Sequence, residues 1–149
     1  MQTIDVQKFY KLLYYGEFAQ AHVLAKHLNL DELWQVMIAI NYEKPSILSY
    51  GYVIAVLIQK ETAGYHYLAS RILIKILNEM EGAYAAGFWH AKRALELETD
   101  NIDYKMQIIN FYSLPGNLLD KRHAALLAQE ILEIDPSNYD AIEILKQNN

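Results

Sequence analysis

The chain has 149 residues, a hydrophobic fraction of 53% and a net charge of −5, which indicates one domain with its own core and excludes a disordered chain. It has no cysteine, so disulfides, thiolate metal sites and a cysteine nucleophile are excluded. The 18 acidic residues outnumber 13 basic ones, which form no block; this argues against nucleic acid or an anionic membrane as a partner and permits a basic protein or peptide.

The sequence shows no targeting signal, so we expect a cytoplasmic protein. The first residues, MQTIDVQKFY, contain no basic segment followed by an apolar one, as a signal peptide would. The longest apolar stretch, YGYVIAVLI, is far shorter than the roughly 20 residues that a membrane span needs. We therefore expect no membrane association.

Apolar residues recur at helical spacing along the whole chain, and only 3 prolines and 6 glycines interrupt it. This pattern predicts an all-α protein. Side chains that can cap a helix N-terminus precede several of the predicted helices: Asp31, Thr62, Asp100 or Asn101, Asn117 and Asn138. In chain order we expect helices over residues 5–15, 17–28, 32–42, 46–60, 63–78, 83–97, 101–112 and 118–134, and a short closing helix over 139–146.

A triplet of small, small and apolar residues at positions i, i+4 and i+7 recurs four times. Residues at this spacing share one helical face, where Ala or Gly allows another helix to approach closely. The first members are 30, 36 and 37 residues apart, so the mean period is about 34. The triplets are Ala21, Ala25, Leu28; Gly51, Ala55, Ile58; Gly87, Ala91, Ala94; and Ala124, Ala128, Ile131.

Two longer segments repeat this pattern independently. GEFAQAHVLAKHL, which starts at Gly16, aligns without a gap with GAYAAGFWHAKRA, which starts at Gly82. Each begins with a glycine and reaches an aromatic residue two positions later, as expected for a turn that enters a second helix. The two starts are 66 residues apart, which is close to two periods.

With this period and these motifs, the chain resembles the tetratricopeptide repeat family over nearly its whole length. The match is best at AKRALELETDN and AQEILEIDPSNYDA; the second repeat is degenerate, and the fourth contains a longer SLPGN turn. The resemblance implies one domain over 1–149, folded as a right-handed superhelical stack of antiparallel helical hairpins. About four hairpins and a C-terminal capping helix are expected. The alternative is an ordinary antiparallel bundle whose faces are rich in alanine.

No motif for catalysis or metal binding is present. The chain contains no HExxH, His-x-Glu or GxSxG motif and no glycine-rich phosphate loop. His22 and His27 do not share a helical face, and a turn near residue 80 would place His66 opposite residue 94 rather than His90. We expect ordinary surface or groove histidines, solvated carboxylates, no enzyme activity, no cofactor and no metal.

The resemblance also implies a binding surface, because the family binds extended peptides or helices in a concave groove lined by first helices. The Lys and Asn pairs that clamp chaperone tails in part of the family are absent. Trp89 is a second candidate, because it points away from the packed face of its helix and either docks on the following hairpin or contacts a partner. The groove positions are Gln7, Lys11, Tyr14, Tyr15, Glu32, Gln35, Tyr42, His66, Ser70, Asp103 and Asn110.

Two functions remain open at this point. The first is a protein-interaction adaptor that binds a protein or peptide in the groove. The second is a small immunity-type or antitoxin-type inhibitor that occludes a toxin, for which small size, acidic charge and exposed aromatic residues are suitable. A toxin gene next to the gene of this protein would favour the inhibitor.

Overall fold

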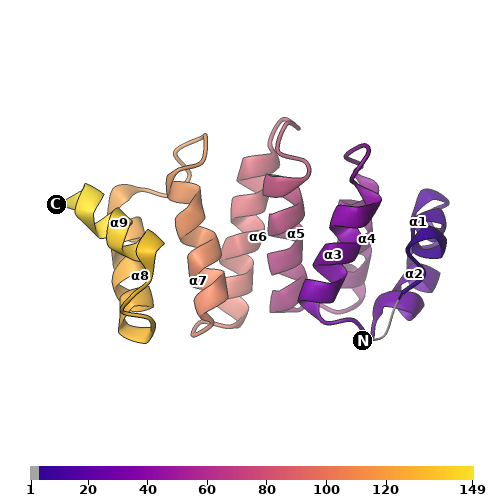
Figure 1. The fold of residues 1–149 in the computed structure, drawn as a ribbon, viewed down its shortest axis with the longest axis horizontal. Helices are drawn as coiled ribbons and strands as arrows, with labels where there is room; N and C mark the ends of the chain where they lie inside the picture. Colours follow the sequence, from indigo (N-terminus) through magenta and orange to yellow (C-terminus); the bar gives the residue numbers. More distant parts are fainter. Residues whose placement is uncertain (1–3) are drawn as a thin grey trace.

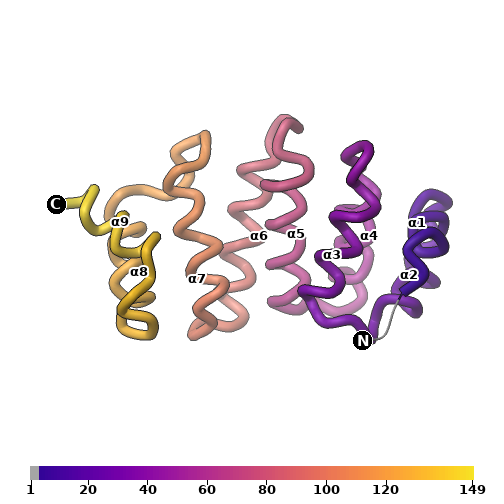
Figure 2. Tube along the Cα trace, in the orientation of Figure 1, coloured from indigo at the N-terminus to yellow at the C-terminus, as the bar shows by residue number. Residues whose placement is uncertain are grey.

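The computed structural model describes residues 4–149, and this part of the chain contains α-helices, one 3₁₀ helix and no strand (Figure 1). The all-α prediction is therefore confirmed. Consecutive helices run in opposite directions and stand side by side from the N-terminal to the C-terminal end, joined by short connections (Figures 1 and 2). The helices are α1 (Val6–Tyr14), α2 (Phe18–Ala25), α3 (Leu30–Ile40), α4 (Leu48–Gln59), α5 (Ala63–Lys75), α6 (Ala83–Leu97), α7 (Ile102–Ile109), the 3₁₀ helix (Asn110–Tyr112), α8 (Lys121–Ile134) and α9 (Tyr139–Asn148).

Helix starts follow the capping chemistry of the sequence in most cases. Thr62, Asn101 and Asn138 each accept a hydrogen bond from a backbone N–H of the helix that follows, as predicted. The predicted cap at Asp31 is wrong, because α3 starts earlier. Asn29 accepts from the backbone of Glu32, and the Glu32 carboxylate accepts from the backbone of Asn29, each at 2.9 Å, which forms a reciprocal capping box.

The start of α8 also differs from the prediction. Asn117 does not cap it, because its φ of 50° places it in the left-handed region of a turn. Asp120 caps α8 instead, and its carboxylate accepts from the backbone N–H of His123 at 2.9 Å. The SLPGN segment therefore remains outside the helix, and α8 begins at Lys121.

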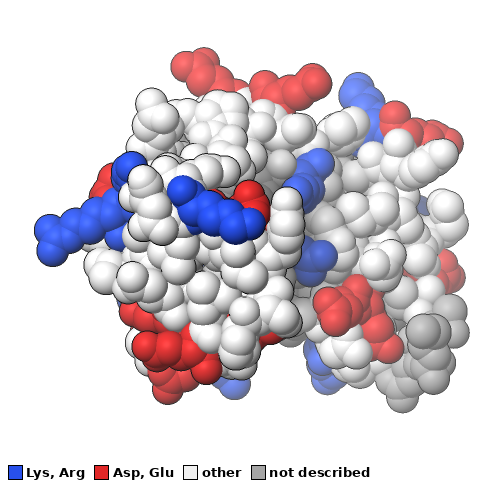
Figure 3. Space-filling view, turned by 60° about the vertical axis from the view of Figure 1, so that its left-hand side comes forward, with Lys and Arg blue, Asp and Glu red and all other residues white. Residues whose placement is uncertain are grey.

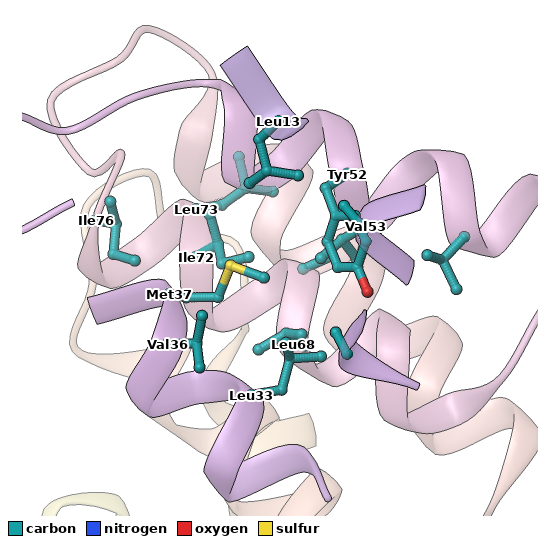
Figure 4. Close-up of a cluster of buried hydrophobic side chains, with 14 of the residues drawn as sticks. Leu13, Leu33, Val36, Met37, Tyr52, Val53, Leu68, Ile72, Leu73 and Ile76 are labelled. Atoms are coloured by element: carbon teal, nitrogen blue, oxygen red, sulfur yellow. The ribbon is translucent and has the colours of Figure 1, made fainter. Parts of the chain in front are cut away.

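Two main groups of buried side chains form the interior. The N-terminal core joins α1 to the first part of α6 and includes Leu13, Leu33, Met37, Tyr52 and Ile72 (Figure 4). The C-terminal core joins the end of α5 to α9, and includes Ile74, Ile108, Phe111, Ala128 and Ile131. Both cores contain residues of α5, so this helix links the two halves of the molecule.

The small residues of the repeated triplets lie at close helix contacts. Ala21, Gly87 and Ala124 are buried, as the spacing predicts. Gly51 is half-buried, and a Cβ atom on it would lie 3.4 Å from Cζ of Phe18. Small side chains at these positions allow neighbouring helices to approach each other closely.

In the part of the chain that the structure describes, no helix combines the length and the apolar character needed to cross a membrane.

Candidate binding surfaces

Exposed tyrosines gather at the N-terminal end of the molecule. Helix α1 buries Phe9 and Leu13, which are one turn apart, so Tyr10 and Tyr14 follow them on the adjoining, exposed face. Tyr15 follows directly, with its ring 5.4 Å from that of Tyr14. We call Tyr10, Tyr14, Tyr15 and Tyr42 the tyrosine surface. Tyr42 is 86% exposed, and Tyr14 and Tyr15 are 63% and 68% exposed.

Two adjoining hollows make this surface continuous. A hollow of about 310 Å³ lies between α1 and the end of α3 and is lined by Gln7, Tyr10 and Tyr42 among others. A second, shallow and open hollow extends along α1, where Gln7 and Tyr10 again contribute, together with Tyr14 and Tyr15. Tyr10 and Gln7 line both hollows. The structure therefore brings Tyr42 of the α3–α4 connection to the same surface as the predicted residues of α1.

The charge around the tyrosine surface differs from that of the whole chain. Lys8 and Lys11 line the second hollow and Lys44 lines the first, whereas Asp5 and Glu43 are the two acidic side chains of these linings. The Asp5 carboxylate already accepts a hydrogen bond from the backbone of Lys8 as the cap of α1. Elsewhere, basic side chains are interspersed with acidic ones, as Figure 3 shows for the face toward the C-terminal end.

Several predicted groove residues lie elsewhere or have structural roles. Ser70 is buried, and its hydroxyl accepts from the Gln107 amide at 3.0 Å, so the prediction that it lines an open groove is wrong. Glu32 is engaged in the capping box of α3. Gln35, Asp103 and Asn110 are exposed on α3, on α7 and in the 3₁₀ helix respectively. None of these residues lines the two hollows of the tyrosine surface.

The predictions for two of the five histidines are wrong. His66 of α5 and His90 of α6 are each 4% exposed, so neither is a surface or groove histidine. Their Nδ1 atoms lie 2.8 Å apart, although the sequence placed His66 opposite residue 94. Helix α5 ends at Lys75 rather than at residue 78, which moves the middle of the turn toward the N-terminus and shifts the counterpart of His66 on α6 toward His90.

The histidine pair belongs to a longer hydrogen-bond network. Nε2 of His90 lies 3.0 Å from the Tyr50 hydroxyl, and Nε2 of His66 lies 3.0 Å from Oε1 of Glu61. Arg93 donates to both oxygens of Glu61, at 2.7 and 3.0 Å. The hydrogen bonds from Arg93 and then from His66 lower the pKa of Glu61 to about 2. Burial, followed by the charge of His66, lowers the pKa of His90 to about 4.

Trp89, the second candidate, is 55% exposed. Its ring lies edge to face with His66 and His90 at centroid distances of 5.5 and 4.9 Å. The aromatic neighbours of Trp89 are therefore residues of its own hairpin.

Arg71 of α5, which the sequence did not indicate as a site residue, extends its guanidinium toward α3. The guanidinium carbon of Arg71 is 4.1 Å from the Trp34 ring centroid and 5.4 Å from that of Tyr67. Its acidic neighbour is Asp31, at 3.9 Å. Tyr67 and Arg71 are four residues apart on one helix, so the helical spacing could have indicated their contact. It could not have indicated the contact between Arg71 and Trp34.

Over residues 4–149, no three His, Asp or Glu side chains are grouped as metal ligands. Comparisons of the chain with family models, with curated proteins and with solved structures gave no match.

Proposed function

We propose that this protein is a non-enzymatic interaction module that binds an acidic segment of a partner protein at the tyrosine surface. We also propose that its helical hairpins form a tetratricopeptide-like stack, of which α1 and α3 are first helices. The observation that carries the binding proposal is the grouping of four exposed tyrosines along two adjoining hollows.

Tyrosine is suited to this role for physical reasons. Its ring offers a large apolar contact area, its hydroxyl forms hydrogen bonds, and only two side-chain torsions must be fixed on binding. Seven of the 12 tyrosines are buried or half-buried. The four of the tyrosine surface are exposed without an evident structural role. Aromatic anchors of this kind often dominate interface energetics.

The lysines support the proposal of an acidic partner. Lys8, Lys11 and Lys44 line the two hollows of the tyrosine surface and outnumber the two carboxylates there, Asp5 and Glu43. A segment rich in Asp or Glu would meet complementary charge here and would associate faster at low ionic strength. Although the charge of the whole chain permits a basic partner, this local charge favours an acidic one.

A phage library of random peptides, selected on the immobilised protein, tests this proposal without knowledge of the natural partner. We expect enrichment of acidic peptides. Tyr14→Ala and Tyr42→Ala should each weaken the selected peptides by about 1–2 kcal/mol. Gln129→Ala, at an exposed position of α8, is the matched control and should leave binding unchanged.

Two results would contradict the proposal. If the selected peptides show no excess of Asp and Glu, the proposal of an acidic partner is wrong. Peptides whose binding is lost with Trp89→Ala but kept with both tyrosine variants would place the site at Trp89 on α6 instead.

A further inference from the structure

The network around His66 and His90 fixes the position of every proton in it. Arg93 keeps the Glu61 carboxylate ionised, so Glu61 can only accept, and Nε2 of His66 must carry the hydrogen that lies between them. A neutral His66 then has its lone pair on Nδ1. Since the two Nδ1 atoms are 2.8 Å apart, the hydrogen between them must belong to His90.

The same reasoning extends to Tyr50. A neutral His90 with its hydrogen on Nδ1 has its lone pair on Nε2, which therefore accepts from the Tyr50 hydroxyl at 3.0 Å. All hydrogen bonds then point the same way, from Tyr50 of α4 through His90 of α6 and His66 of α5 to Glu61. One tautomer of each ring satisfies the network when both rings are neutral.

We propose that the His66–His90 pair is a buried binding site for a single proton, and that filling it reverses the hydrogen-bond chain between Tyr50 and the two rings. The added proton binds at Nε2 of His90, the lone pair at the Tyr50 end of the chain. The Tyr50 hydroxyl then accepts from His90 instead of donating. This inference concerns α4, α5 and α6 and does not depend on the function of the tyrosine surface.

The Glu61 carboxylate offsets part of the cost of burying the first added proton, whereas the geometry of the pair opposes a second. The hydrogen between the two Nδ1 atoms can move to His66, which places the positive charge 3.0 Å from the Glu61 carboxylate. A second added proton would put a hydrogen on each Nδ1, and the two would meet across 2.8 Å. The other charged groups near the pair are Arg93 and Glu96, and Arg93 forms ion pairs with both Glu61 and Glu96.

Nitrogen-detected NMR of the imidazole side chains tests the site in the unmodified protein. At neutral pH we expect His66 with its hydrogen on Nε2 and His90 with its hydrogen on Nδ1, the less common tautomer. On acidification, the two rings together should take up one proton while the fold is intact. His27, at an exposed position, provides an internal reference in the same spectra.

A variant tests the role of the carboxylate. Glu61→Gln removes the charge beside His66, so the pH at which the pair takes its proton should fall by about 1 unit or more. Glu130→Gln, which breaks an ion pair between α7 and α8, is the control and should leave that pH unchanged. The proposal is overturned if both rings carry Nε2 hydrogens at neutral pH, or if the folded pair takes up two protons independently.

Discussion

Gly87 of α6 lies directly against Ile74 of α5, so that a Cβ atom on Gly87 would come within 2.8 Å of the Ile74 Cγ2 atom. Phe111 and Leu73 stand 3.5 Å from the same position. Because Gly87 has no side chain, α5 and α6 can pack this closely at Ile74.

Gly87→Ala should destabilise the protein. Overpacking costs about 1–3 kcal/mol and outweighs the gain of up to about 1 kcal/mol in helix propensity. The measurement is the free energy of unfolding in urea. Gly64→Ala is the matched control, because the added methyl would meet Cδ1 of the half-buried Leu30, the end of a side chain that can rotate. We expect Gly64→Ala to be neutral or stabilising, and equal losses for both variants would refute the argument.

Ala91→Leu should lower the free energy of unfolding by about 1–3 kcal/mol, because Ala91 is fully buried in the C-terminal core and additional methylenes force strain there. Ala85→Leu, at an exposed position of the same helix, provides a comparison with the same change of side chain. Denaturant midpoints of both variants measure the difference. An unchanged midpoint for Ala91→Leu would show that this face of α6 is loosely packed.

Stability should fall in acid because of His90. In the unfolded chain this ring binds a proton near its ordinary pKa of 6.5, whereas the folded protein lowers that pKa to about 4. The contribution of His90 is present above pH 6.5 and is lost as the pH falls toward 4, since the unfolded chain binds the proton first. One pKa unit corresponds to about 1.4 kcal/mol, and screening reduces the effect, so we expect a loss of about 2 kcal/mol.

Urea unfolding between pH 7 and pH 4 measures this loss. His90→Gln should flatten the pH dependence, whereas His27→Gln, at an exposed position, should retain it. A wild-type slope that persists in His90→Gln would assign the acid sensitivity to other groups.

The ion pair between Lys105 and Glu130 should respond asymmetrically to substitution. The Lys105 side chain is 10% exposed and the Glu130 side chain 51%, and their charged atoms are 2.8 Å apart. Glu130→Gln leaves a buried ammonium without its counter-charge and should cost about 1–2 kcal/mol, less than in a fully buried pair. Lys105→Met removes the buried charge itself and should be close to neutral. Thermal unfolding of both variants checks this order, and a larger loss for Lys105→Met would reverse the interpretation.

Local signals predicted the helices better than the contacts between them. Helix α6 has the bounds expected from the sequence, and the caps at Thr62 and Asn138 are confirmed, because these features depend on residues within one or two turns. His66 and His90 were placed wrongly because pairing across a hairpin depends on where the first helix ends. An error of three residues at the end of α5 contributed to the predicted separation of two rings that share a hydrogen bond.

For the tyrosine surface, too, the sequence predicted features within one helix but not the contacts between helices. The pattern of α1 indicates that Tyr14 lies beside the buried face, and both Tyr14 and Tyr42 were among the predicted binding residues. Tyr10, Lys8 and Lys44 were not, because their shared position depends on how α1 lies against the end of α3. No spacing in the sequence specifies that arrangement.

The division of the interior into two cores implies that the molecule does not respond to stress as a single rigid block. Helices near the end of a linear array are held on fewer sides than those in the middle, so they open at a lower free energy. Helix α1 lies at such an end (Figure 1), and the N-terminal core beneath it is separate from the C-terminal core. We therefore expect α1 to open at a lower free energy than α4, α5 and α6 in the middle of the array.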